Sequence, residues 1–431
     1  MRKAVVLGGY GLIGAACMRA LTAEGFAVTG IGRSRAVALA SSPDATWVIR
    51  DIRAIDVAEW QALLADADVV VNAAGALQDG ARDNLEAVHV TLLSRLVEAT
   101  RGLPLRIVQI SAAGAEPAAS TEFFRSKARG DAILAAGARN WVILRPVLVL
   151  SPEAYGGTAL LRGVAALPLI LPRVLPEARV QTVHVDDLAG AVVVAAKGQV
   201  PSGLVADLTE PGAQSFATLV DCVRHWQGFP APRFRPAFPD ALLRLIGRGA
   251  DGLGHLGWRS PLRSSALQAL SDGIRGDPTA WLEAGGRPCR SLSATLESLP
   301  ATRQERLFAR SYFLLPLAIA TLALFWCASG AITLIDPARA MAVLGGRGIP
   351  AWIAAPTVFG GALADILLGL AILWRPRARM AALGMIGLSA AYLLGSLVLA
   401  PDLWLDPLGP MIKVIPGMVL AAMVALGLEE R

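Results

Sequence analysis

A glycine-rich turn near the start of the chain has the spacing that binds a dinucleotide. The apolar stretch Ala4–Leu7 predicts a strand, and Gly8, Gly11 and Gly14 lead from it into a helical pattern that runs to about Glu24. The first glycine permits a tight turn, the second lets the backbone approach a pyrophosphate, and the third lets the helix pack on the sheet. The helix N-terminus attracts the anion. The candidate cofactor-binding residues of this turn are Gly8, Tyr10, Gly11, Leu12, Ile13 and Gly14.

The end of the second predicted strand indicates which dinucleotide is bound. It reads Gly30-Ile31-Gly32-Arg33 and lacks the acidic residue that would bind a ribose 2′-hydroxyl. Arg33 offers a cation for a 2′-phosphate instead, so the sequence favours NADP(H) over NAD(H). The alternative is an ordinary solvated surface arginine.

Strands and helices alternate after the glycine turn in the order that builds a parallel sheet. The further strands are predicted at Ala27–Ile31, Thr46–Ile49, Asp68–Asn72, Leu105–Ile110 and Trp141–Leu144. The helices are predicted at Ser34–Ala40, Val57–Ala65, Ala81–Thr100 and Thr121–Gly137. We therefore expect an α/β Rossmann-type, doubly wound parallel sheet.

The composition indicates a second, membrane-embedded part. The chain is 54% hydrophobic and only 17% charged, and residues 311–431 hold just seven of its 40 basic and six of its 34 acidic side chains. A spanning helix needs about 20 mainly apolar residues. Four such spans are predicted, at Ser311–Ile335, Trp352–Trp374, Met380–Ala400 and about Pro410–Leu428. The C-terminal part is thus expected to be an all-α transmembrane four-helix bundle in the lipid bilayer.

Basic residues at the span ends predict the orientation. Three arginines precede the first span, and three more fill the connection between the second and third. The soluble part and both termini should therefore face the cytoplasm, at the cell inner membrane. Arg339 and Arg347, in the first external loop, oppose this assignment. The net charge of +6 is scattered, which argues against a nucleic-acid partner, and the four cysteines and four histidines form no metal-ligand pattern.

One acidic residue, Asp365, lies inside the second predicted span. An acid in a spanning helix is energetically costly and usually faces other helices or water. It is either a proton, quinone or ligand site, or a structural polar contact. Gly360, Gly361 and Gly369 lie nearby and would allow close approach of another helix.

The soluble part resembles a short-chain dehydrogenase/reductase of the extended, epimerase-like or atypical type. The resemblance covers roughly residues 1–300. Besides the glycine turn, its motifs are Asp51-Ile52, Asn72-Ala73-Ala74-Gly75, Ser111, Ser126-Lys127, Arg145-Pro146 and Val183-His184-Val185-Asp186-Asp187-Leu188. The resemblance implies that Asp51 lies near the adenine, that Ala73, Ala74 and Gly75 line the cofactor, and that Lys127 binds the nicotinamide ribose. We expect the cofactor domain at 1–230, a substrate-lobe or linker segment at 231–305 and the membrane domain at 306–431.

The catalytic pattern of that family is incomplete here. Its acid is a tyrosine four residues before the lysine, and this position is Phe123, which has no phenolic proton. Lys127 is retained as a catalytic candidate. Ser111 is a second candidate, as a hydroxyl that orients a carbonyl, although it could equally be a strand-end cap. Tyr155, just after the sixth strand, is a candidate substitute acid.

The C-terminal part resembles the DoxX-like membrane family, on its span count, its short loops and Gly360-Gly361 followed by Asp365. The fusion suggests a membrane-anchored, NADP(H)-binding oxidoreductase that acts on a quinone or another lipophilic substrate, with a membrane redox partner as a further option. The alternative is a non-catalytic NADPH-binding assembly or sensor protein tethered to a membrane partner.

Two amphipathic stretches precede the first span, at Asp240–Arg248 and Ser264–Ser271. They either cap the substrate pocket or lie on the membrane surface, with Arg244, Arg248 and Arg263 toward the headgroups.

Overall fold

The computed structural model describes residues 1–80 and 84–428, which form two compact units. The first contains Met1–Asp251 and Ser260–Ala309, and the second contains Gly252–Arg259 and the chain from Arg310 onward. The division expected at residues 230 and 305 stays a prediction.

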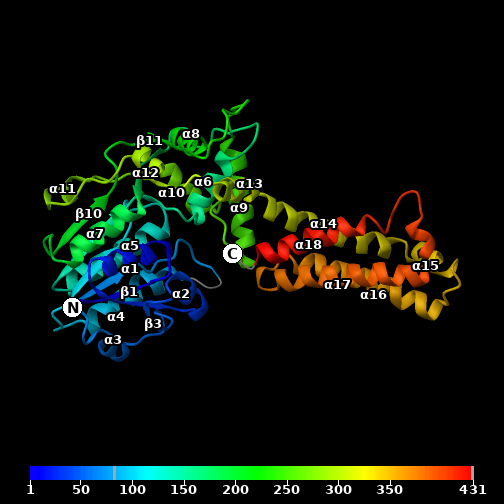
Figure 1. Cartoon of the computed structure of the whole chain (residues 1–431), viewed down its shortest axis with the longest axis horizontal. Helices are drawn as coiled ribbons and strands as arrows, with labels where there is room; N and C mark the ends of the chain where they lie inside the picture. Colours follow the sequence, from blue (N-terminus) through cyan, green and yellow to red (C-terminus); the bar gives the residue numbers. More distant parts are fainter. Residues whose placement is uncertain (81–83, 429–431) are drawn as a thin grey trace. The chain divides into compact units, whose positions relative to one another are not determined.

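A seven-stranded, wholly parallel sheet forms the centre of the first unit (Figure 1). Its strands, in spatial order, are β10 (Leu204–Leu208), β6 (Trp141–Pro146), β5 (Arg106–Ile110), β4 (Val69–Asn72), β1 (Lys3–Leu7), β2 (Ala27–Gly32) and β3 (Thr46–Ile49). The order reverses between β1 and β4, and this is where a doubly wound sheet opens a crevice at the carboxyl ends of its strands. The predicted Rossmann-type sheet is confirmed.

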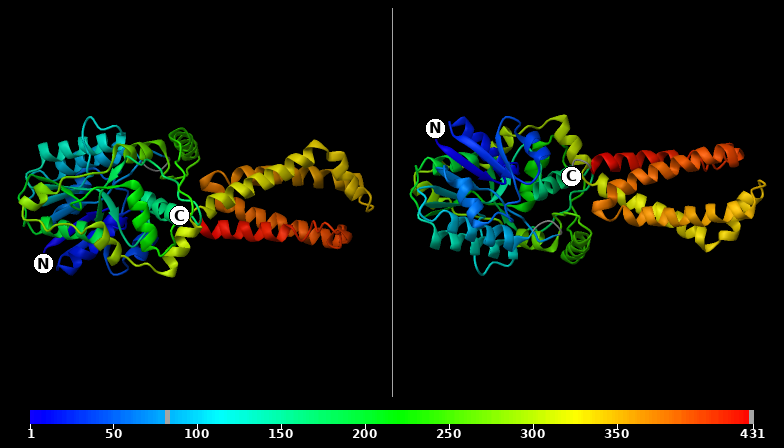
Figure 2. Two further views of the ribbon diagram at one scale, coloured as in Figure 1. Left: turned by 90° about the horizontal axis from the view of Figure 1, so that it is seen from above. Right: turned by 90° about the horizontal axis from the view of Figure 1, so that it is seen from below.

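Helices cover both faces of this sheet (Figure 2). One core joins the sheet to α1 (Leu12–Ala23) and α7 (Val185–Ala196), and the other joins it to α3 (Val57–Leu64), α4 (Leu92–Ala99) and α5 (Glu122–Gly137). The short helix α2 (Arg35–Ser41) connects β2 to β3.

The helix predicted at Ala81–Thr100 begins later than expected. Residues 81–83 lie outside the described part, and Asn84 is not helical. Its side chain instead accepts a hydrogen bond from the backbone N–H of Ala87, as a helix N-cap does. A π-helical turn, Ala87–Thr91, then leads into α4.

A smaller lobe with its own apolar core follows the sheet. It contains two two-stranded sheets, formed by β7 (Leu148–Leu150) with β9 (Thr182–His184) and by β8 (Arg179–Val180) with β11 (Gln214–Ser215). Its helices are α6 (Gly156–Ala165), α8 (Phe216–Trp226) and α12 (Leu292–Ser298). The remaining helices in this part of the chain are α9 (Asp240–His255), α10 (Ser264–Asp272), α11 (Thr279–Glu283) and α13 (Arg303–Ser311).

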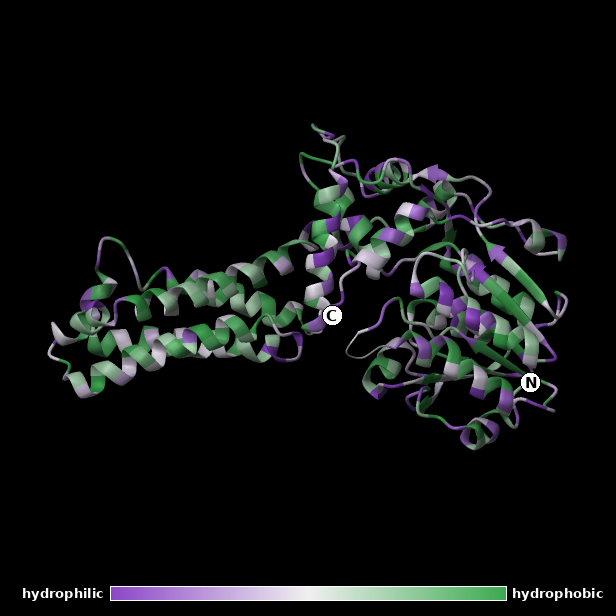
Figure 3. Cartoon of the chain, turned by 180° about the vertical axis from the view of Figure 1, so that it is seen from behind, coloured by the Kyte–Doolittle hydropathy of each residue, from purple (hydrophilic) through white to green (hydrophobic). Residues whose placement is uncertain are grey.

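Long apolar helices make up most of the second unit (Figure 3). They are α14 (Leu314–Ile335), α16 (Ala351–Ala371), α17 (Arg375–Leu399) and α18 (Val414–Gly427), with the short α15 (Pro337–Gly345) and a 3₁₀ turn at Pro401–Trp404 between them. Three helical stretches, Arg303–Ile335, α16 and α17, are long and apolar enough to cross a membrane.

The fourth apolar helix, α18, is shorter than the predicted span at Pro410–Leu428. It has 14 residues, because the backbone at residues 410–413 forms turns. Pro416 lies in the first turn of α18, where its missing N–H costs no hydrogen bond, and it would break a helix that began much earlier.

Asp365 joins three helices of this unit. Its side chain is buried, and its two carboxylate oxygens accept hydrogen bonds from Ser329 Oγ on α14 (2.8 Å) and from Tyr392 Oη on α17 (3.0 Å). Gly330 permits this approach, because a Cβ there would overlap the carbonyl oxygen of Ala362 on α16. Both oxygens therefore have donors within the helix bundle.

Asp365→Asn should loosen this helix packing. An amide has only one acceptor oxygen, so one of the two hydroxyl donors would lose its partner, at a cost of about 1 kcal/mol for a bond between membrane helices. Unfolding of the full-length protein in detergent should show the loss. Thr333→Val is the matched control, because Thr333 Oγ1 donates to a carbonyl of its own helix, that of Ser329. Equal stability of the Asp365→Asn protein and the wild type would contradict this role.

Candidate cofactor-binding site

The glycine turn folds against the carboxyl ends of β1 and β2. Gly8 has a positive φ of 70°, and its N–H and that of Gly9 donate to the carbonyl of Ile31 (3.1 and 3.2 Å). A Cβ on Gly14 would overlap the carbonyl oxygen of Gly8. The third glycine is therefore required by the turn itself, and not only by packing of the helix on the sheet.

The N-terminus of α1 is suited to an anion. Gly11 is exposed, it caps the helix without a side chain, and the first turn contains no acidic residue. The first N–H groups of a helix lack partners within the helix and carry its positive dipole end. This backbone cradle, which the overlap of a Gly14 side chain with the Gly8 carbonyl would disrupt, fits a pyrophosphate.

Tyr10 fixes the end of β2. Its hydroxyl accepts a hydrogen bond from the backbone N–H of Arg33 (3.0 Å), and its ring lies 6.1 Å from that of Trp47. Gly32 leaves room for the tyrosine, since a Cβ there would overlap the ring. The sequence singled out Tyr10 as a cofactor contact but gave no sign of this supporting role.

Two arginines and one carboxylate gather at the ends of β2 and β3. Arg53 forms a two-atom ion pair with Asp51, the shorter distance being 2.6 Å from Nη2 to Oδ2. The hydrogen bonds from Arg53 hold the pKa of Asp51 below its usual value, and the charge of the exposed Arg33 acts in the same direction. The sequence analysis missed Arg53, although its position two residues after Asp51 was a usable signal.

The loop after β4 is held by a buried amide pair. Asn72 donates from Nδ2 to Gln109 Oε1 on β5 (2.8 Å), and its own oxygen accepts from the backbone N–H of Ala74 (3.2 Å). A Cβ on Gly8 would lie 3.1 Å from the Cα of Ala74, so the glycine turn and this loop are in close contact.

Lys127 lies buried beside the same loop. Its ammonium donates to the carbonyl of Ile110 at the end of β5 (2.8 Å), and a Cβ on Gly75 would lie 3.7 Å from Nζ. Burial lowers the pKa of Lys127 to about 8, against the opposing effect of the Asp131 carboxylate. Lys127 is therefore still mostly protonated at neutral pH.

The hydroxyl of Ser111 is bound within the protein. It donates to Oδ2 of buried Asp131 (2.7 Å), which also accepts from Arg145 Nη2 (2.9 Å). Burial raises the pKa of Asp131, while Ser111 and Arg145 oppose that rise. The role of Ser111 in orienting a carbonyl stays a prediction, and its proton has a buried acceptor.

Phe123 packs against a histidine that the sequence left unassigned. The rings of Phe123 and His89 are 5.7 Å apart at 74°. His89 Nε2 accepts from the backbone N–H of Ala76 (3.3 Å), so the ring proton is placed on Nδ1, which lies 2.8 Å from Ser126 Oγ. Burial lowers the pKa of His89 to about 2, with the charge of Lys127 adding to the effect. A neutral His89 thus joins the loop after β4 to α5.

Tyr155 is the N-cap residue of α6, away from these contacts. Its side chain is 65% exposed, and its backbone N–H bonds Thr158 Oγ1 (3.2 Å). Its role as a substitute acid stays a prediction. Among residues 1–80 and 84–428, no three His, Cys, Asp or Glu side chains cluster closely enough to hold a metal ion.

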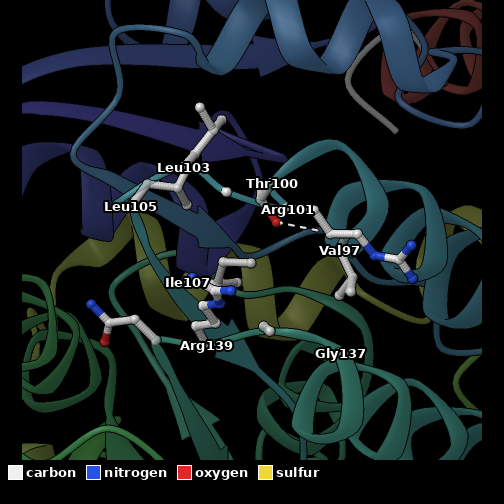
Figure 4. Close-up of a pocket in the computed structure, with 11 residues that line it drawn as sticks. Val97, Thr100, Arg101, Leu103, Leu105, Ile107, Gly137 and Arg139 are labelled. Carbon is white, nitrogen blue, oxygen red and sulfur yellow. Dashed lines mark hydrogen bonds between the residues drawn. The ribbon is translucent and has the colours of Figure 1, made fainter.

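A separate hollow lies at the opposite, amino-terminal edge of the sheet (Figure 4). It has a volume of about 210 Å³ and lies between the start of β5 and the C-terminal ends of α4 and α5, with Arg101 and Arg139 among its lining residues. None of the predicted cofactor residues lines it.

Two family models match the chain. One, described as NAD(P)H-binding, covers residues 8–165, and the other, the DoxX-like family, covers residues 323–422. The chain joins an NAD(P)H-binding domain to a DoxX-like domain. The NAD(P)H-binding match contains the glycine turn, the loop after β4 and Lys127, and the DoxX-like match contains Asp365. No significant match to a curated protein was found.

Solved structures of similar fold are NAD-dependent epimerases and related proteins. WbmH of Bordetella bronchiseptica, in complex with NAD⁺, is 20% identical with a TM-score of 0.52, over 72% of this chain and 98% of that one. UDP-glucuronic acid 4-epimerase of Bacillus cereus, in complex with NAD, is 17% identical with a TM-score of 0.52, over 72% and 99%. UDP-glucose 4-epimerase of Thermotoga maritima, with UDP-glucose, is 15% identical with a TM-score of 0.53, over 72% and 99%. At these identities the likeness shows the fold alone, which is that of the epimerase and short-chain dehydrogenase type.

Proposed function

We propose that the protein is a membrane-anchored, NADP(H)-binding oxidoreductase that acts on a quinone or another lipophilic substrate. The observation that carries the proposal is the open cradle formed by the glycine turn and the N-terminus of α1, at the same sheet edge as Lys127. The three apolar helices long enough to span a bilayer support the anchoring. The arginines that flank them support a cytoplasmic cofactor domain at the cell inner membrane.

The predicted cofactor-binding residues each have a place in this proposal. The turn from Gly8 to Gly14 would hold the diphosphate, and Arg33 would bind the 2′-phosphate. Asp51 would lie near the adenine. Ala73, Ala74 and Gly75 would line the cofactor, and Lys127 would bind the nicotinamide ribose. A bound NADPH supplies a hydride, and reduction of a quinone to a quinol takes up one further proton, which we assign to water. Phe123 cannot supply that proton, and Ser111 already donates its own to Asp131.

Arg33→Ala should weaken NADPH binding about ten-fold and leave NADH binding unchanged, because only NADPH carries the 2′-phosphate. The hydrogen bond from the backbone N–H of Arg33 to the Tyr10 hydroxyl is retained in this variant. Affinities measured by nucleotide fluorescence would test this. Arg35→Ala, at another exposed arginine two residues later, is the control. An equal loss for both nucleotides would contradict a 2′-phosphate contact.

Lys127→Met should weaken NADPH binding roughly 10- to 100-fold, the usual effect of losing a hydrogen bond to a charged group. In the wild type, affinity should fall as the pH rises through about 8, because Lys127 then loses its charge. The pKa of Lys127 in the folded protein lies below its usual value of 10.5. The folded state should therefore become more stable relative to the unfolded state as the pH rises from about 8 to 10.5. NADPH titrations at a series of pH values around 8 would show the fall in affinity in the wild type and not in the methionine variant. The control is Lys197→Met, which removes the surface ion pair with Glu24.

The second candidate function is a non-catalytic NADPH-binding assembly or sensor protein. The observation that favours it is that the family's proton-transfer groups are absent or bound elsewhere: position 123 is phenylalanine, Ser111 donates to Asp131, and Lys127 donates to Ile110. Such a protein would bind NADPH without oxidising it.

Equilibrium binding tests the part that both candidates share. The full-length protein in lipid nanodiscs should bind NADPH saturably, as seen by thermal shift or by nucleotide fluorescence. A protein that is folded but shows no NADPH-dependent change would contradict both functions.

A further inference from the structure

Helix α9 carries an exposed apolar stripe, which we call the leucine face. Its members share one side of the helix through spacings of three, eight and three residues, and they are Leu242, Leu245, Leu253 and Leu256, the last just past the helix end. Their exposed fractions are 43%, 64%, 45% and 38%. The helix is held to the protein by its other side, where Leu243, Gly247 and Ala250 are buried. The leucine face is thus turned away from the core that anchors the helix.

Positive charge borders the leucine face. Arg244 and Arg248 are exposed and lie four residues apart on the helix. Within residues 1–80 and 84–428, neither forms an ion pair. The acid in the second half of the helix, Asp251, is paired with Arg263 (3.2 Å), which also donates to the carbonyl of Asp79. Arg263 is therefore engaged within the protein. The other acid of the helix, Asp240, lies in its first turn, so Arg244 and Arg248 leave a net positive charge beside the leucines.

The C-terminal end of α9 is fixed to the membrane-capable helices. Residues Gly252–Arg259 belong to the second unit, where Trp258 Nε1 donates to the carbonyl of Leu373 (2.6 Å). The backbone N–H of Arg375 donates to the carbonyl of Leu256 (3.0 Å), and its guanidinium lies 5.7 Å from the Trp258 ring centre. Leu373 and Arg375 form the junction of α16 and α17, so Leu256, the last residue of the leucine face, is bonded to the junction between two candidate spans.

We propose that α9 lies on the membrane surface, with the leucine face in the acyl boundary and with Arg244 and Arg248 against anionic lipid headgroups. A helix with leucines on one side and arginines beside them is the kind that binds in the plane of an anionic interface. The inference rests on the membrane placement in the proposed function but on no reaction. A bilayer is the occupant that matches both the cationic border and the continuity with α16 and α17.

Spin-label accessibility in the full-length protein, reconstituted in nanodiscs with anionic lipid, tests this directly. The four native cysteines are free and would first be replaced by alanine or serine. Single labels are then placed at Leu245→Cys, at Leu39→Cys and at Leu324→Cys. Leu39 is an exposed leucine of α2 in the first unit (44%), and Leu324 is an exposed residue of α14 (72%). Collisions with oxygen, which enriches in lipid, are compared with those of a water-soluble nickel complex.

The label at 245 should be more accessible to oxygen than to nickel, like that at 324, whereas the label at 39 should favour nickel. Arg244→Gln and Arg248→Gln should each lower the ratio of membrane-bound to unbound helix, as reported by the label at 245, about five-fold. Replacing the anionic lipid by neutral lipid should do the same. Nickel accessibility at 245 equal to that at 39, or shielding of 245 from both reagents by a protein surface, would overturn the proposal. If the label at 324 favours nickel, the membrane placement of the second unit itself fails.

Discussion

Phe123→Tyr is expected to raise NADPH-dependent carbonyl reduction about 100-fold or more. A correctly placed general acid typically contributes 100- to 10,000-fold to the rate. Residue 123 lies one helical turn before Lys127 on α5, so a phenol there would share a helix face with the ammonium, whose charge favours the phenolate. Phe123 already has an aromatic ring in that space, against His89 and Phe124 (5.1 Å), so the change adds only a hydroxyl.

The neighbouring residue provides the control for this gain. Phe124→Tyr adds the same hydroxyl one position later, where the helix turns the side chain away from the Lys127 face. Initial rates of NADPH oxidation with a lipophilic ketone would compare both variants with the wild type. If neither variant gains activity while both still bind NADPH, the substrate side of the site is closed, and the non-catalytic binding protein is the better account.

Gly14→Ala is expected to abolish NADPH binding and to lower the melting temperature by roughly 5–10 °C, which corresponds to about 3 kcal/mol of overpacking. The new Cβ would overlap the carbonyl oxygen of Gly8, which is backbone and cannot rotate aside. The turn and the first turn of α1 must then separate, and this opens the cradle proposed for the diphosphate.

Gly190→Ala is the matched control for this change. Gly190 also lies inside a helix, α7, but its added Cβ would point into open space among the described residues. Replacement of an exposed helical glycine by alanine stabilises by about 0.5–1 kcal/mol, so this variant should melt slightly higher and bind NADPH normally. Thermal unfolding with and without NADPH measures both effects. A Gly14→Ala protein that binds as well as the Gly190→Ala protein would contradict the assigned turn.

The sequence predicted the sheet well because its signals were local. The strand, glycine turn and helix at residues 4–24 follow from hydrophobic periodicity and glycine spacing, and both family matches agree with the two parts that composition separated. The late start of α4 and the short α18 depend on particular residues, namely the capping Asn84 and Pro416. Such details are visible in the sequence only as weak preferences.

Contacts between distant residues were beyond sequence reasoning. The link from Ala76 through His89 to Ser126 joins three separate segments, and His89 gave no motif of its own. The acceptors of Ser111 and Lys127, Asp131 and the Ile110 carbonyl, likewise depend on how α5 packs on β5. Residue type suggested the candidate positions, but three-dimensional packing decides where their protons go.

The most direct measurement for the central claim is NADPH oxidation by proteoliposomes that contain the full-length protein, with and without a lipophilic quinone analogue. The account predicts that quinone-dependent loss of reduced-nicotinamide absorbance is present in the wild type and absent in the Gly14→Ala variant. Saturable NADPH binding without any oxidation, across quinones of different chain length, would contradict an oxidoreductase function.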